Sequence, residues 1–183
     1  MNKKILTATL LSCFSLTALA DSPTFNYFDI GYVTWRADGS SLSNSPSGLE
    51  LNFSSAINDN FYIAGDLNYI SNNGRSTTLA TAGAGYMNHF SDTTSFFAEL
   101  DVAIAKAENR DSQIGYEIDF GIRSMISEKL ELKGAIEYID INNADTFLNI
   151  GTAYYFSDSF GAYFDYKINE DIHRFSIGIR STF

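Results

Sequence analysis

Two histidines, His89 and His173, are the side chains of this 183-residue sequence best suited to general acid–base chemistry near neutral pH. Each lies in a segment where apolar and polar residues alternate, and such segments are typical of β-strands. Ser176 is close to His173, but three positions separate the two, so a regular strand places their side chains on opposite faces. The sequence therefore predicts no serine–histidine pair, and we expect that the protein is not an enzyme.

Sites for cofactors and metals have equally little support in the sequence. Gly83, Gly85 and Gly121 form no phosphate-binding loop, because no helix start follows them. The loop 108–111 has an arginine in its middle and no glycine, unlike a calcium loop. Trp35, near the end of the first alternating segment, is expected to be an interfacial aromatic residue, with ligand stacking as the alternative. We therefore expect no cofactor and no bound metal.

Many of the other ionisable side chains occupy every second position of the alternating segments, opposite the apolar residues. In a strand such a row lies on one face of the sheet. If the sheet closes into a barrel with its apolar face outward, the row lines the lumen, where charges must be paired or hydrated. The predicted lumen charges are Asp29, Glu50, Asp66, Glu99, Asp101, Glu117, Asp119, Arg123, Glu131, Lys133, Glu137, Asp165, Lys167, Arg174 and Arg180. Acids outnumber bases in this row, so some carboxylates are expected to lack a basic partner.

Ten alternating segments are needed to position these residues, and turn-forming residues separate them. The predicted strands are residues 25–36, 48–57, 61–70, 77–90, 95–106, 114–126, 130–141, 146–156, 160–168 and 172–183. Their lengths suit strands that cross the hydrocarbon core at a tilt. The prediction is an all-β fold, a transmembrane antiparallel up-and-down β-barrel of ten strands, with eight strands as the alternative.

Four of the connections share one form, in which an apolar residue is followed by Ser or Asn, then an acid, then another apolar residue. They lie at residues 57–61, 90–96, 126–130 and 156–160. Ser, Asn and Asp favour tight turns because their side chains bond the nearby backbone. Since these are alternate connections, they lie at one end of the barrel, and we expect that end to face the periplasm. The other five are expected to be extracellular, around Ser40, Asn73, Asn109, Asn143 and Glu170.

The beginning of the sequence has the features of a secretory signal peptide. Two lysines precede a short apolar stretch at residues 5–16, and residues 18–20 form a small-residue cleavage site. The predicted organisation is a signal peptide at 1–20 and an outer-membrane barrel at 21–183. Cleavage removes Cys13, the single cysteine, although lipidation of this residue is an open alternative.

Composition narrows the class of protein further. The net charge of −10 argues against nucleic acid as a partner and against docking on anionic lipid as a peripheral protein. No long uninterrupted apolar run follows residue 20, so the sequence predicts no transmembrane helix in that part of the chain. Aromatic residues nevertheless make up 15 % of the chain, as expected when only alternate residues meet lipid.

The last segment places Phe175, Ile177, Ile179 and Phe183 on one face and basic or small residues on the other. This pattern resembles the closing strand of bacterial outer-membrane barrels, whose terminal phenylalanine is read by the barrel-assembly machinery. The resemblance implies that these four residues form an assembly signal.

From residue 25 to 183 the chain resembles small bacterial outer-membrane barrels of the opacity-protein and porin-like kind. In particular it resembles a ten-stranded xanthomonad family once labelled a quorum factor. The residues that carry this resemblance are 27–32, 53–62, 83–86 and the final segment. It implies export to the cell outer membrane, with membrane lipid, lipopolysaccharide and the assembly machinery as partners.

Two functions are consistent with these observations. The first is a structural or cell-surface interaction role, with short extracellular loops, a charged and largely filled lumen and an extracellular ligand that the sequence does not name. The alternative is a narrow, weakly cation-selective, porin-like channel for small ions or solutes. We expect a monomer in either case. A soluble periplasmic β-protein would instead be recovered in the soluble fraction.

Deleting Phe183 should impair insertion, because the residue ends the apolar row of the final strand. The measurement is the amount of heat-modifiable, folded protein in the outer membrane. An unchanged yield would show that Phe183 is not an assembly signal.

Overall fold

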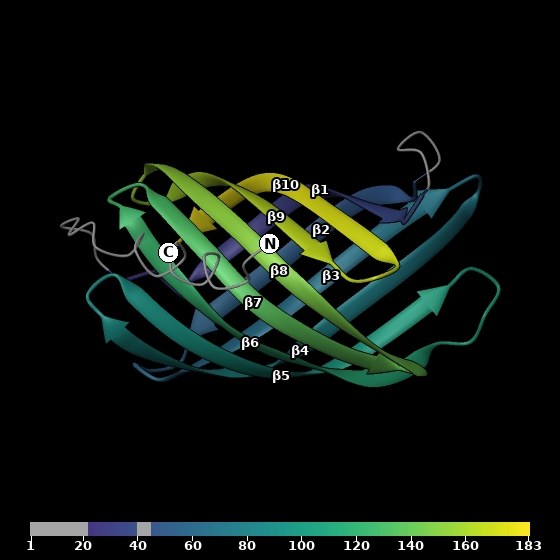
Figure 1. The fold of residues 1–183 in the computed structure, drawn as a ribbon, viewed down its shortest axis with the longest axis horizontal. Helices are drawn as coiled ribbons and strands as arrows, with labels where there is room; N and C mark the ends of the chain where they lie inside the picture. The colour runs from purple at the N-terminus through teal and green to yellow at the C-terminus, as the bar shows by residue number, and fades with distance from the viewer. Residues whose placement is uncertain (1–21, 40–44) are drawn as a thin grey trace, which may run out of the picture.

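The computed structural model describes residues 22–39 and 45–183, which form a closed antiparallel barrel (Figure 1). Each strand pairs with its neighbours in the chain, and β1 pairs with β10 to close the sheet. The strands are β1 (Tyr27–Ala37), β2 (Ser47–Ala56), β3 (Phe61–Asn72), β4 (Arg75–Ser91), β5 (Thr94–Ala107), β6 (Gln113–Ser127), β7 (Leu130–Ile141), β8 (Asn143–Ser157), β9 (Phe160–Ile168) and β10 (Ile172–Thr182).

The predicted all-β barrel of ten strands is therefore confirmed, and the eight-stranded alternative is wrong. The predicted signal peptide 1–20, with Cys13, and the loop centre at Ser40 lie outside the described residues. Among the described residues there is no helix whose length and apolar character would let it cross a membrane.

The largest boundary difference is at β8, and both β4 and β8 begin earlier than predicted. Backbone pairing continues there beyond the end of the apolar alternation. Ile141 is opposite Asn143 across a connection at Asn142, whose φ is 74°. The β3–β4 connection is Asn73-Gly74, with φ values of 51° and 75°. Positive φ at both residues is the geometry of the tight turn that Asn-Gly sequences favour.

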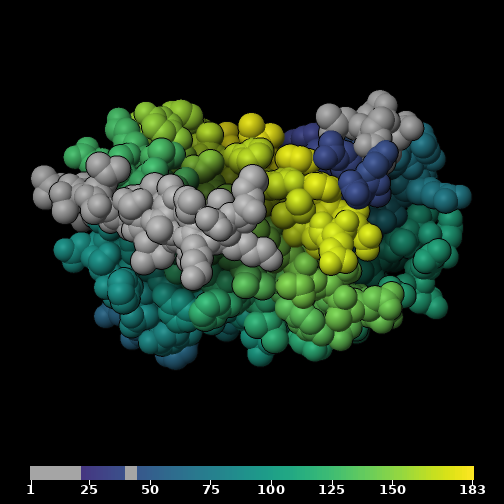
Figure 2. Space-filling view, viewed as in Figure 1, coloured from purple at the N-terminus to yellow at the C-terminus, as the bar shows by residue number. Residues whose placement is uncertain are grey.

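Alternate residues of every strand point to opposite sides of the wall, as the period of two requires. Ile118 is 44 % exposed on the outside, whereas Glu117, next to it, is buried inside. The other strands repeat this pattern, and the outer face carries most of the exposed large apolar side chains. Figure 2 shows the side chains of β9 and β10, in yellow-green and yellow, packed side by side on that outer face. An apolar exterior of this kind suits contact with lipid hydrocarbon.

Two aromatic residues differ from the sequence prediction. Trp35 is on the inward face of β1, in register with the lumen residue Arg174, so the prediction of an interfacial residue is wrong. Its position has the same parity as that of Asp29, and this parity decides its direction. Phe25 precedes β1 instead of beginning it, and its ring is buried inside the barrel at 4 % exposure.

The connections β2–β3, β4–β5, β6–β7 and β8–β9 lie together at one end of the barrel, and in the first two a side chain bonds the backbone of the turn, as expected from the sequence. Asn58 Oδ1 accepts hydrogen bonds from the backbone N–H groups of Asn60 and Phe61, at 2.9 and 3.0 Å. Ser91 Oγ accepts one from the N–H of Thr93 at 3.3 Å. We call this end of the barrel the short-turn end, and the opposite end the outer mouth.

The facing assignment can be tested with a pair of adjacent substitutions in β6. Ile118→Arg places a charge on the apolar outer face and should destabilise the folded barrel by about 2–4 kcal/mol at mid-membrane. Asp119→Asn should be mild, because it changes an inward side chain in an acid-rich lumen. Unfolding by urea in lipid vesicles measures both. Comparable losses for the two variants would mean that the phase of β6 is wrong.

Candidate functional site

The lumen is the candidate site, since it contains the charged rows, and all the predicted lumen charges lie on its side of the wall. From the short-turn end to the outer mouth, it contains an aromatic plug, a set of ion pairs and a more apolar region. The inward positions of consecutive strands build each layer.

The aromatic plug consists of Phe25, Tyr62, Met87 and Phe97, which are buried together at the short-turn end. The Phe25 ring lies 4.8 Å from that of Tyr62 and 6.4 Å from that of Phe97, measured between centroids. Ser54 Oγ donates a 2.7 Å hydrogen bond to the carbonyl of Phe25, which fixes the segment before β1 inside the barrel.

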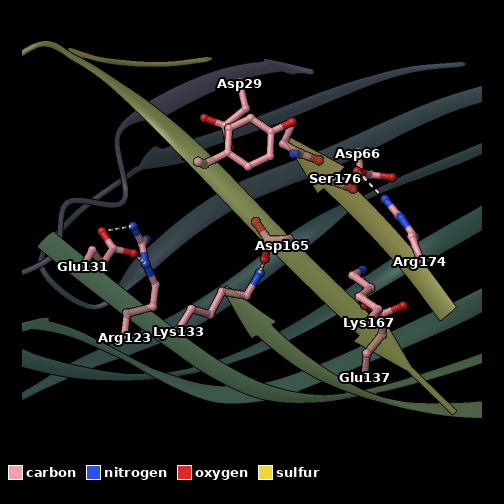
Figure 3. Close-up of polar contacts among 12 residues, drawn as sticks. Asp29, Asp66, Arg123, Glu131, Lys133, Glu137, Asp165, Lys167, Arg174 and Ser176 are labelled. Atoms are coloured by element: carbon pink, nitrogen blue, oxygen red, sulfur yellow. Dashed lines mark hydrogen bonds and ion pairs between the residues drawn. The ribbon is translucent and has the colours of Figure 1, made fainter. Parts of the chain in front are cut away.

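Two arginines lie directly beyond the plug. Arg123 donates two hydrogen bonds to Glu131, at 2.7 and 3.0 Å, and Tyr155 donates a third at 2.8 Å. Arg180 binds Asp29 with two bonds of 2.8 Å in the same bidentate manner. Paired parallel bonds of this kind are the strongest arrangement for an arginine and a carboxylate. The first of these pairs is visible in Figure 3.

Arg174 is the centre of the next cluster. It pairs with Glu50, donates a 2.8 Å hydrogen bond to Asn68 Oδ1 and lies 3.6 Å from Asp66. Glu50 also accepts bonds from Ser176 at 2.9 Å and from Tyr163 at 3.1 Å. With only 2 % exposure, Glu50 depends on these donors for its charge.

The space for Tyr163 comes from two glycines. Gly31 and Gly178 are opposite each other on β1 and β10. A Cβ at Gly31 would lie 2.3 Å from the Tyr163 hydroxyl oxygen, and one at Gly178 would lie 2.7 Å from its ring. The close approach of the Tyr163 ring to β1 and β10 therefore requires glycine at both of these positions.

Two lysines complete the pairing. Lys133 lies 3.4 Å from Asp165, and Lys167 pairs with Glu137 (Figure 3). The Lys133–Asp165 pair is the more accessible of the two, because 30 % of the Lys133 side chain is exposed.

The remaining acids form an acidic wall on β5 and β6, consisting of Glu99, Asp101, Glu117 and Asp119. The register sets Asp101 opposite Glu117 and Glu99 opposite Asp119. Within the described ranges, no basic side chain lies within ion-pair distance of these four. Both carboxylate oxygens of Asp101 are buried there without a hydrogen-bond partner.

One group within this region has the geometry of a cation site. Carboxylate oxygens of Glu117, Asp119 and Glu137 lie within 4.8 Å of one another. Such oxygens suit a hard divalent cation. Glu137 already pairs with Lys167, so a cation would compete with an ammonium group for it. The sequence analysis tested the loop 108–111 and missed this set, because its members come from two neighbouring strands.

The histidines lie at opposite ends of the barrel, and one of them contacts a serine that the sequence analysis did not consider, so the expectation of no serine–histidine pair is wrong for His89. His89 Nδ1 lies 2.8 Å from Ser95 Oγ beside the β4–β5 turn. His173 contacts the Tyr166 hydroxyl at 2.6 Å on the outer face of β10, whereas Ser176 bonds Glu50 inside the lumen. The strand parity that separates His173 from Ser176 is therefore present in the structure.

The residues predicted as an assembly signal lie on the outer face. Phe175, Ile177 and Ile179 point away from the lumen, and Ile177 is 59 % exposed. The ring of Phe183 is stacked on that of Phe53 at a centroid distance of 6.3 Å.

Sequence reasoning missed several polar partners, chiefly Asn68, Tyr155, Tyr163 and Ser176. Their inward parity was readable from the alternation. The bonds of Asn68, Tyr163 and Ser176 were not, because they join strands that are distant in the sequence, whereas Tyr155 bonds Glu131 on the neighbouring strand.

Arg174→Met should destabilise the barrel by about 3–5 kcal/mol, because it leaves Glu50 buried without its counter-charge. Lys133→Met, at the more accessible pair with Asp165, should cost about 1 kcal/mol or less. Denaturant unfolding in lipid vesicles compares the two. The double variant Arg174→Met, Glu50→Gln should recover most of the loss. Equal losses for the two single variants would contradict this ranking of the ion pairs.

Comparison with known proteins supports the fold. The chain is 32 % identical over 65 residues to the outer membrane porin PhoE of Salmonella typhimurium, which is 36 % of this chain and 19 % of the porin. It is also 32 % identical over 68 residues to outer membrane protein S2 of Salmonella typhi, covering 35 % of this chain and 18 % of that protein. The chain therefore matches about a fifth of the length of these curated relatives. No family model matches it.

Among solved structures, the KdgM porin in complex with disordered oligogalacturonate superposes with a TM-score of 0.52 and 15 % identity. The superposition covers 85 % of this chain and 99 % of the porin. The resemblance to the xanthomonad family stays a prediction. The fold is that of the outer-membrane β-barrel proteins, and part of the sequence is similar to porins.

Proposed function

We propose that this protein is a barrel of the bacterial outer membrane with a structural or cell-surface interaction role, and that it is not an open channel. The apolar exterior and the barrel fold support the location. The partial sequence match to porins supports it as well. In this proposal the short-turn end faces the periplasm and the outer mouth faces the exterior.

The observation that carries the proposal is the filled lumen. The aromatic plug and the two bidentate arginine pairs lie next to one another at the short-turn end. The Arg123 guanidinium lies over the Phe25 ring at 4.6 Å, so the plug and the ion pairs are in contact. The central cavity that remains has a volume of about 100 Å³. A lumen packed in this way is expected near the lower limit of barrel size.

The surface available to partners is small. The two longest connections, residues 38–46 and 108–112, both leave from the outer mouth. The other three connections at that end are tight. Contact with another surface would therefore involve these two loops and the aromatic rim of the outer face, including Tyr69 and Tyr116.

A narrow cation-selective channel is the second candidate, because of the acidic wall. Glu99 and Asp119 line the central cavity and have no basic partner among the described residues. Uncompensated carboxylates attract cations and repel anions. Oligogalacturonate, the ligand named for the KdgM porin, is a polyanion, so this lumen is poorly suited to it.

Single-channel recording in a planar bilayer separates the two functions. The unmodified protein should show no conductance, because the aromatic plug closes the lumen. The variant Phe25→Ala, Tyr62→Ala should conduct weakly and favour cations. Phe53→Ala, on the outer face, is the matched control and should remain silent. A stable, cation-selective conductance from the unmodified protein would favour the channel. A large anion-selective conductance would overturn both the facing assignment and the filled lumen.

A further inference from the structure

The outer mouth contains a cavity of about 240 Å³ that no function proposed above uses. We call it the outer pocket. Residues from β1 and from β4 to β10 line it, so it occupies the lumen between the ion pairs and the exterior. It differs from the centre of the lumen in its chemistry, because apolar side chains form most of its wall.

The apolar wall consists of inward residues from four strands, namely Leu79, Ile139, Ile141, Phe147 and Ile172. At these positions apolar side chains face inward, as they do in the aromatic plug, whereas the centre of the lumen is charged. These side chains face the lumen and so do not contact lipid. An apolar ligand in the pocket would remove their surface from water, which is favourable. Concave, mostly apolar sites with a few polar groups are the usual form of small-molecule sites.

Two polar groups at this pocket are donors without a partner. Within residues 22–39 and 45–183, Trp35 Nε1 and Arg174 Nε are buried and make no hydrogen bond. Both side chains line the outer pocket, and they are opposite each other in the β1–β10 register. The guanidinium carbon of Arg174 lies 5.6 Å from the centre of the Trp35 ring. Two adjacent donors favour a ligand that presents a hydrogen-bond acceptor.

Three of the four charged side chains that line the pocket are paired in the protein, and the fourth, Asp145, accepts a hydrogen bond from Asn169 Nδ2 at 3.3 Å. Arg174 pairs with Glu50, and Lys167 pairs with Glu137. Beside Trp35 and Arg174 the described residues of the pocket therefore offer a ligand hydrogen-bond donors and no unpaired positive charge. An acceptor head group, either neutral or carboxylate, fits this chemistry.

We propose that the outer pocket binds a small amphipathic molecule. Its apolar body contacts the apolar wall, which includes Leu79 and Phe147, and its hydrogen-bond acceptor lies beside Trp35 and Arg174. A dry cavity of about 150 Å³ is enough for benzene. The outer pocket is larger and so has room for an aromatic ring with a short polar arm. The site extends the proposed surface role, but it does not depend on it.

Trp35 is the only tryptophan of the chain, so its fluorescence reports on this pocket alone. The folded protein in lipid vesicles is titrated with benzyl alcohol and with phenylacetate, which differ in head group. Toluene lacks the acceptor, and acetate lacks the apolar body. Saturable changes are expected for at least one of the first two probes, with affinities about tenfold weaker for toluene and acetate. The tighter of the two head groups identifies the neutral or the anionic class.

Two variants show that the signal comes from the pocket. Ala105→Leu fills part of the cavity, which Ala105 lines, and should weaken binding several-fold without changing the unfolding midpoint. Trp35→Phe, Tyr116→Trp moves the single indole to the outer face, where only partitioning into lipid is reported, and should give no saturable change. The proposal is overturned if no probe saturates, if Ala105→Leu binds as before, or if the outer-face indole gives the same curve.

Discussion

The antiparallel pairing of β1 with β10 is the constraint on which the rest of this structure depends. In hydrocarbon every backbone N–H and C=O group needs a partner within the protein, and a sheet meets this requirement only when it has no free edge. The register from Tyr27–Thr182 to Ala37–Ile172 removes that edge. Once the ladder is closed, the period of two assigns each side chain to lipid or to the lumen.

Closure also explains why the lumen is layered. The lumen of a barrel of this size is largely filled by its own side chains, so most inward residues must be compatible with their neighbours. At the short-turn end Phe25 and Tyr62 fill it with rings, and at the centre Arg174 and Glu50 fill it with matched charge. The acids of β5 and β6, such as Asp101, have no basic partner among the described residues. They therefore form the part of the wall most suited to a cation.

The fold and the direction of each charge were predictable from the sequence, because both follow from strict alternation. Asp119 and Ile118 are adjacent, and their separation into lumen and exterior needs no tertiary information. The pairing of Arg174 with Glu50 was not predictable, because the two residues lie on strands that meet only through closure. Trp35 was misplaced because its residue type suggested an interface while its parity indicated the lumen. Phe25 was misplaced because alternation does not reveal where a strand begins.

Ion pairs across the closing seam also bear on the order of assembly. Arg180 and Asp29 are separated by 151 positions in the chain, and Arg174 and Glu50 by 124. Neither pair can form in a partial sheet, so an intermediate within the bilayer would carry these charges without their partners, at high free energy. The pairing of β1 with β10 and the formation of these two ion pairs therefore occur together. A barrel that has not closed therefore has both an unpaired sheet edge and unpaired lumen charges, and each of these disfavours contact with hydrocarbon.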